Sequence, residues 1–133
     1  MEKIRIDNGT KRIEVNDNGD FIELPLGDKS FPDRFFNFAN KVIGRYEEVS
    51  KSIDLMEAEE QRKKMLEIAQ ANMKDVDELF GDGTCNKVFG NIIPDDYMIM
   101  ELFEQLTPYI QKYGKQRREE IQKKYAPKRA SRC

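Results

Sequence analysis

The chain contains no histidine, no tryptophan and only two cysteines in 133 residues. Without histidine, it lacks the usual general base that activates a serine or cysteine nucleophile. Cys85 and Cys133 are too few for a disulfide framework, which favours a reducing compartment. No apolar run approaches the roughly 18 residues that a membrane span requires, and residues 1–5 carry no signal-peptide core. We therefore expect a cytoplasmic protein without a membrane partner, and nothing indicates a cofactor.

Charge is unevenly distributed along the chain. Residues 1–114 hold 15 Lys and Arg against 23 Asp and Glu, whereas residues 115–133 hold 8 against 2. A basic terminal segment suits an acidic partner or nucleic acid, although most charge runs are simply solvated. Nucleic acid is the poorer fit, because few aromatic side chains lie between these cations. The basic residues nearest the end are Lys123, Lys124, Lys128, Arg129 and Arg132.

The first 27 residues predict a three-stranded antiparallel meander. Pro25 lacks an N–H group, so the third strand should end at a sheet edge. The acidic turn at 17–20 resembles part of a calcium-binding loop, but it lacks that loop's full spacing and distal glutamate, and we interpret it as a hairpin turn. The expected strands are residues 4–6, 12–15 and 21–26, separated by turn residues at 7–9 and 16–20.

From Ser30 onward the apolar residues follow a helical period. Ser30 is placed to cap a helix N-terminus, and Pro32 suits the first turn. An apolar stripe predicts core packing against the sheet, with an aromatic docking patch at residues 35–38 or self-association along the stripe as alternatives. Because charged residues interrupt the pattern before it resumes and ends at Gly81, residues 31–80 form either one long helix or a helical hairpin. The stripe comprises Phe31, Phe35, Phe38, Val42, Tyr46, Val49, Ile53 and Met56.

A glycine-punctuated loop, FGDGTCNKVF at residues 80–89, contains fragments of two functional motifs. It is not a Walker phosphate loop, because Lys87 is neither preceded by glycine nor followed by Ser or Thr. Cys85 is either a nucleophile whose pKa Lys87 or a helix N-terminus lowers, or a small buried residue that anchors the loop. Several carboxylates occur as adjacent pairs, which point about 100° apart on a helix and do not share a site. We therefore expect a protein that is not an enzyme.

The last third predicts two further helices. Asp95 or Asp96 can cap the first, which has a broad apolar face. Thr107-Pro108 should separate the two helices, and the second should end at 126–127.

Together these patterns predict an α+β fold that is mostly α. A single domain over residues 1–125 would combine the meander at 1–27 with a bundle of about four helices at 30–125. Residues 126–133 would form a basic disordered tail.

Three segments resemble a family of small proteins from long-tailed bacteriophages and prophages of Gram-positive hosts. They are IEVNDNGD at 13–20, SFPDRFF at 30–36, and the block VDELFGDGTCNKVFG at 76–90, which continues to FEQLTPY at 103–109. Members of this family are encoded beside tail tube and tape-measure proteins and are regarded as tail assembly chaperones or chaperone-like proteins. The resemblance is carried mainly by the third segment.

The resemblance implies a protein that binds the tape-measure protein in the host bacterial cytoplasm, with the tail tube protein or a second copy of itself as further partners. A groove for an amphipathic helix suits methionine, whose flexible side chain can repack. The alternatives are a small regulatory or counter-defence protein that acts by protein–protein binding, and an enzyme that uses Cys85. The residues expected to line the partner groove are Phe89, Ile92, Ile93, Met98, Met100 and Phe103.

Overall fold

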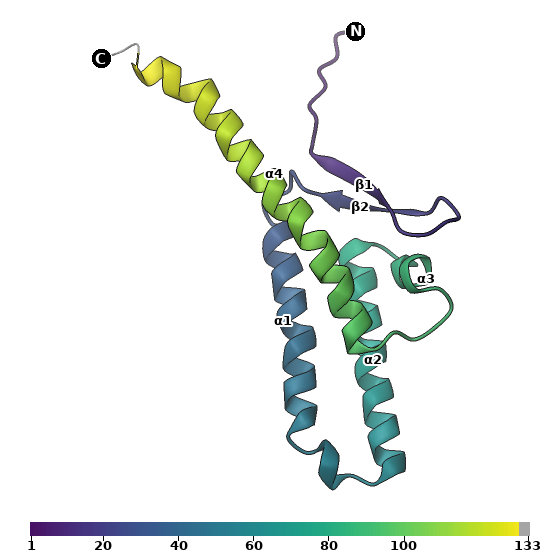
Figure 1. Cartoon of the computed structure of the whole chain (residues 1–133). Helices are drawn as coiled ribbons and strands as arrows, with labels where there is room; N and C mark the ends of the chain where they lie inside the picture. Colours follow the sequence, from purple (N-terminus) through teal and green to yellow (C-terminus); the bar gives the residue numbers. More distant parts are fainter. Residues whose placement is uncertain (131–133) are drawn as a thin grey trace.

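The computed structural model describes residues 1–130, with side chains through Tyr125, and is mostly helical. A β-hairpin lies beside α4 near one end of the antiparallel pair of α1 and α2, which extends away from it (Figure 1). No described helix is long and apolar enough to cross a membrane. In chain order the elements are β1 (Thr10–Glu14), β2 (Phe21–Pro25), α1 (Phe31–Ser50), the 3-10 turn η1 (Ile53–Leu55), α2 (Ala58–Phe80), α3 (Thr84–Phe89) and α4 (Asp96–Ala130).

Within residues 1–130 the sheet has two strands rather than the three expected. β1 pairs antiparallel with β2, with Ile13 opposite Ile22, and the side chain of Ile22 is buried in the core. The predicted strand at residues 4–6 is wrong, because Ile4 and Ile6 are 87% and 83% exposed. A segment with alternating apolar residues forms a strand only where it can pair with a neighbouring strand and pack its apolar face against the core.

The predicted turn at residues 7–9 does form, and it anchors the N-terminal segment against the loop between β2 and α1. Asp7 Oδ1 accepts a hydrogen bond from the Gly9 N–H at 2.9 Å. Gly9 has a positive φ of 75°. A Cβ at Gly27 would overlap the Asn8 carbonyl, and a Cβ at Gly9 would overlap the hydroxyl of Tyr113. Glycine is therefore required where these two backbone segments cross.

Residues 31–80 form a helical hairpin, which resolves the choice between one rod and two helices. The turn at η1 is closed by Gln61, whose side-chain amide donates to the carbonyls of Ile53 at 2.8 Å and Met56 at 3.0 Å. At the start of α1, Ser30 occupies the N-cap position but makes no capping hydrogen bond. Its hydroxyl donates to Asp28 instead, at 2.7 Å. The expectation that the Ser30 side chain caps this helix is therefore wrong.

The predicted apolar stripe is mostly core. Phe31, Phe35, Phe38 and Val42 are buried against β2, α2 and α4, so this part of the stripe is not a surface for docking or self-association. Phe38 stacks on Phe103 of α4, with ring centroids 4.7 Å apart.

α4 is continuous from Asp96 to Ala130, so the breaks expected at Thr107-Pro108 and at residues 126–127 are wrong. Pro108 removes one backbone hydrogen bond, and the Thr107 hydroxyl donates to the Phe103 carbonyl at 2.7 Å. Buried side chains before and after the proline, Phe103, Leu106 and Ile110, hold both halves of the helix against the same core. Tertiary packing thus outweighs the cost of an internal proline.

The C-terminal part of α4 projects beyond the bundle (Figure 1). Every side chain from residue 118 to residue 125 is exposed. The expected disordered tail begins inside this helix, because residues 126–130 continue it. Residues 131–133 lie outside the described part of the chain.

Candidate functional site

The segment predicted as a loop contains a short helix, α3. Gly81 ends α2 as the sequence predicts, and Gly81 and Gly83 have φ values of 116° and 83°. The Asp77 carboxylate accepts a hydrogen bond from the Cys85 N–H at 3.0 Å, and the Thr84 hydroxyl donates to the Gly81 carbonyl at 2.7 Å. These bonds satisfy polar groups where the chain turns out of α2 and into α3. The pattern of glycines was correctly interpreted as a turn, but the helix that follows was missed.

Cys85 is buried in this turn and does not have the environment of a reactive thiolate. The residue is 2% exposed, and its Sγ lies 3.6 Å from the Met73 carbonyl oxygen. Burial, followed by the charge of Asp77, raises the pKa of the thiol to about 12. The hypothesis that Lys87 or a helix end lowers this pKa is wrong in direction. The interpretation of Cys85 as a small buried anchor is confirmed by its burial.

The six residues expected to line a partner groove divide into two groups. Phe103 is 2% exposed and lies in the core, and Met100 is partly buried against the same core. Phe103 contacts Phe35 and Phe38 of α1, and neither Phe103 nor Met100 lines the depression that Phe89 and Met98 share. The sequence could not separate them from the others, since the apolar face of α4 is broad.

The other four residues form a surface that we call the α3–α4 surface: Phe89, Ile92, Ile93 and Met98. Phe89 and Met98 line a depression of about 270 Å³ whose remaining walls are Val15, Val88, Glu101, Leu102 and Gln105. Ile92 and Ile93 lie in the segment between α3 and α4 and are 50% and 48% exposed. This surface combines half-exposed apolar side chains with a polar rim.

The turn between β1 and β2 packs against α3 through Asn16. Its side-chain amide donates to the Lys87 carbonyl at 3.0 Å and to Asp20 Oδ2 at 2.8 Å. Asn16 Oδ1 also accepts a hydrogen bond from the Asn18 N–H at 2.8 Å. This bonding agrees with a hairpin turn, and in the described residues no group of three or more His, Cys, Asp or Glu side chains could hold a metal ion.

A buried polar network that sequence reasoning missed joins three helices. Asn72 is 0% exposed, accepts from Arg45 Nη1 at 2.8 Å and donates to Asp96 Oδ1 at 2.9 Å. Arg45 also pairs with Asp75. Burial, with Asp95 as a second cause, raises the pKa of Asp96, and the hydrogen bond from Asn72 opposes that shift. An available signal was the position of Asn72 four residues after Ile68 and four before Val76, inside an apolar stripe.

The basic residues expected near the C-terminus lie on or beyond the projecting end of α4. Lys123 and Lys124 are exposed on this helix. Lys128 and Arg129 fall in its last turns, where side chains are not described, and Arg132 lies outside the described residues.

Asp95, one of the two expected caps, accepts a hydrogen bond from the Met98 N–H at 2.9 Å and so caps α4 at its N-terminus.

Comparison with known proteins gives one family and no closer relative. Neither the curated proteins nor the solved structures include a match to this chain. The model of a family of unknown function, DUF6673, matches residues 18–133, which include β2 and all the helices. The chain therefore belongs to the DUF6673 family, whose function is unknown.

Proposed function

We propose that this protein is a non-enzymatic tail assembly chaperone of a long-tailed bacteriophage or prophage. It would bind the tape-measure protein in the host bacterial cytoplasm and assist assembly of the tail tube. The proposal rests on the resemblance of residues 13–20, 30–36 and 76–109 to such chaperones. The structural observation that carries it is the α3–α4 surface, which is apolar and half-exposed.

The α3–α4 surface has the properties that recognition of an amphipathic helix requires. The depression beside Phe89 and Met98 can receive an apolar side chain, and Ile92 and Ile93 are exposed apolar side chains in the segment that connects α3 to α4. Met98 can adapt to different side chains along a long client, because its thioether chain is flexible. Glu101 and Gln105 at the rim offer hydrogen bonds to the polar face of the same helix. The hydrogen bond from the Asn16 side chain to the Lys87 carbonyl holds the β-hairpin against α3 at this depression.

Co-expression with the tape-measure protein from the same genome tests this proposal. The wild-type chain should keep that protein soluble and co-purify with it. A double variant, Ile92→Glu with Met98→Glu, should reduce both readouts at least about tenfold, because burying carboxylates in an apolar contact costs more than ~1.4 kcal/mol. Leu66→Glu is the matched control. Leu66 is 46% exposed on α2, so its replacement adds one carboxylate, half the charge of the double variant, at an apolar position about as exposed as Ile92.

Two results would contradict the proposal. In the first, the wild-type chain neither co-purifies with the tape-measure protein nor raises its soluble fraction. In the second, the chain does so, but the double variant and Leu66→Glu behave alike, which would remove the α3–α4 surface from the proposal. Capture of a host regulatory or defence protein in place of the tape-measure protein would support the alternative role by protein–protein binding.

A further inference from the structure

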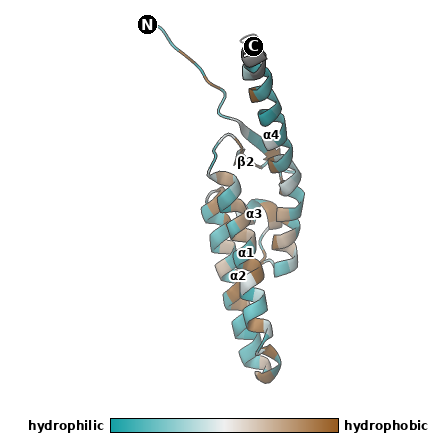
Figure 2. Cartoon of the chain, turned by 90° about the vertical axis from the view of Figure 1, so that its left-hand side faces the viewer, coloured by the Kyte–Doolittle hydropathy of each residue, from teal (hydrophilic) through white to brown (hydrophobic). Residues whose placement is uncertain are grey.

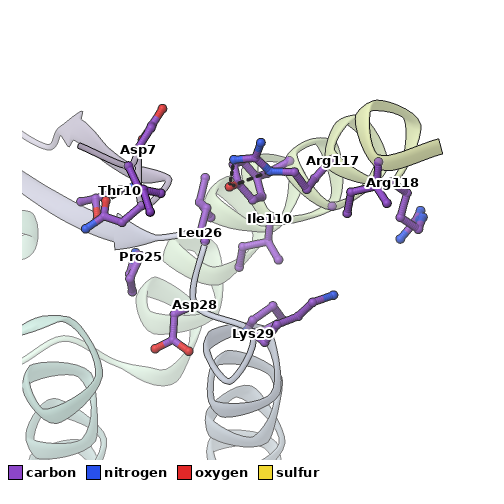
Figure 3. A pocket seen from close by; sticks show the side chains of 16 residues that line it. Asp7, Thr10, Pro25, Leu26, Asp28, Lys29, Ile110, Arg117 and Arg118 are labelled. Atoms are coloured by element: carbon purple, nitrogen blue, oxygen red, sulfur yellow. Dashed lines mark hydrogen bonds between the residues drawn. The ribbon is translucent and has the colours of Figure 1, made fainter. Parts of the chain in front are cut away.

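A cavity of about 550 Å³ lies between the N-terminal segment, the loop from β2 to α1, and α4 (Figure 3). It is distinct from the α3–α4 surface and shares no lining residue with it. Its apolar lining includes Ile6, Pro25, Leu26, Pro32, Ile110 and Ile121. A cavity of this size lies within the range of roughly 300–1,000 Å³ that encloses a small ligand or a few side chains.

Three cations and two carboxylates line this cavity. Lys29, Arg117 and Arg118 line it, and Figure 3 shows both arginines on α4 and Lys29 on the opposite wall. Among the described residues, Lys29 and Arg118 form no ion pair, whereas Arg117 is hydrogen-bonded within α4. Asp28 is paired with Arg34, whereas Asp7 accepts from the Gly9 N–H and keeps its negative charge. Among the described residues, two cations and one carboxylate of the lining therefore have no ion pair. An apolar group flanked by carboxylates is therefore the complementary occupant.

The far end of the same chain presents such a group. Leu55 is 87% exposed in η1, at the turn between α1 and α2. That turn is hydrophobic and lies at the end of the molecule opposite to the C-terminal end of α4 (Figure 2). Asp54 and Glu57 flank Leu55, are exposed, and make no ion pair with any described residue. Residues 53–60 contain four acidic residues and no basic one, and the first cation of α2 is Arg62.

We propose that the Leu55 turn of one copy of this chain inserts into the cavity between the N-terminal segment and α4 of a second copy. One molecule cannot make this contact with itself. The turn and the cavity lie at opposite ends of α1, whose 20 residues span about 30 Å. The side chain of Leu55 would contact Ile121, a half-exposed apolar residue of the lining, while Asp54 and Glu57 would approach Lys29 and Arg118.

This contact uses different surfaces on the two copies, so it is heterologous and can continue from copy to copy. It is small, since one turn enters one cavity, and small interfaces are weak and transient. Its charged part is solvent-accessible, so added salt should weaken it. We therefore expect association that grows with protein concentration and declines as ionic strength rises.

Sedimentation velocity on the full chain tests the inference between about 10 µM and about 1 mM protein, at low and high salt. The wild-type weight-average mass should rise with concentration at low salt and fall toward the monomer at high salt. Leu55→Lys removes the turn's apolar group, and Arg118→Glu reverses a charge at the cavity. Each variant alone should stay monomeric. An equimolar mixture should form a heterodimer, because one variant retains the cavity and the other retains the turn.

Leu66→Lys is the control for an added surface charge, and it should associate as the wild type does. Both test residues are exposed, so circular dichroism should show that the variants fold. A wild-type chain that remains monomeric up to about 1 mM overturns the inference and leaves the cavity to an acidic segment of another protein. A mixture that stays monomeric while the wild type associates also overturns it, since the contact would then be elsewhere. The inference does not depend on the proposed tail role, which the co-expression assay tests separately.

Discussion

Asn72, in the middle of α2, donates a hydrogen bond to Asp96 Oδ1 in the first turn of α4, at 2.9 Å. The other side of the same amide accepts from Arg45 of α1 at 2.8 Å. One fully buried side chain therefore links three helices at the level where α4 begins. A buried amide is stable there only because both of its ends are hydrogen-bonded. The network fixes the starting point of α4 relative to the helical hairpin.

Replacing Asn72 with leucine should lower the unfolding free energy by about 2–3 kcal/mol, as measured by urea titration. The side chains are similar in size, but the change removes the hydrogen bond to Asp96, whose buried Oδ2 already lacks a partner among the described residues, and one of the two partners of Arg45. Asn40→Leu is the control, because Asn40 is exposed on α1 and its replacement should change stability by less than about 0.5 kcal/mol. Equal effects at the two positions would contradict a structural role for the network.

Asp96 should make stability fall as pH rises. Its pKa is higher in the folded chain than the ordinary 3.8, mainly because of burial, and its Oδ2 has no hydrogen-bond partner among the described residues. A carboxyl with a raised folded-state pKa binds more protons when folded, so its contribution to stability decreases as pH rises between the unfolded and folded pKa values. Wild type should therefore lose stability relative to Asp96→Asn as pH rises above about 3.8. Urea titrations of both proteins at several pH values measure this difference, and a constant difference would contradict it.

Two glycine-to-alanine changes should have opposite effects on the melting temperature. At Gly27 a Cβ would overlap the Asn8 carbonyl, so the N-terminal segment must move. We therefore expect Gly27→Ala to lower the free energy of unfolding by about 1–3 kcal/mol, and with it the melting temperature. Gly44 lies within α1, and a methyl group added there would meet no atom within 4 Å. Alanine at this position should therefore raise the free energy of unfolding by about 0.5–1 kcal/mol, because alanine favours the helix more than glycine does. A loss at Gly44 would show that its space is filled by something other than solvent.

Local signals in the sequence predicted the elements that depend on neighbouring residues. Gly81 as a helix end, Asp95 as a cap and the turns around Gly9 and Gly19 were all recognisable, because each depends on a few adjacent residues. The burial of Phe35 and Phe38 followed from helical spacing in the same way. These features need no knowledge of what packs where.

Features that depend on distant segments could not be predicted. Ile4 and Ile6 do not join the sheet, because in the described fold neither β1 nor β2 pairs with a third strand. Helix α4 continues through Pro108 because Phe103 and Ile110, on either side of it, pack in the same core. At the candidate site, sequence spacing could not show that Phe103 faces inward while Met98 lines a depression. That distinction depends on where the hairpin and α3 rest on α4.

Cys85 should resist modification in the folded protein. In a Cys133→Ser background, a disulfide reagent at pH 8 should leave Cys85 unmodified in buffer and modify it fully in urea. A thiol with a pKa of about 12 is thiolate in only about one molecule in 10⁴ at this pH, and the buried Sγ is closed to the reagent as well. The measurement is the absorbance of the released thiol over time.

A cysteine at an exposed position gives the matched comparison. Ser50→Cys, in a chain where Cys85 is alanine and Cys133 is serine, places a thiol on the exposed surface of α1 and should react within minutes. If native Cys85 reacted at a similar rate, the turn from Gly81 to α3 would have to open readily, because the Asp77 carboxylate disfavours the thiolate whenever the turn is closed. Rapid reaction would thus revive the possibility of cysteine chemistry, whereas protection leaves Cys85 as the apolar anchor of the turn.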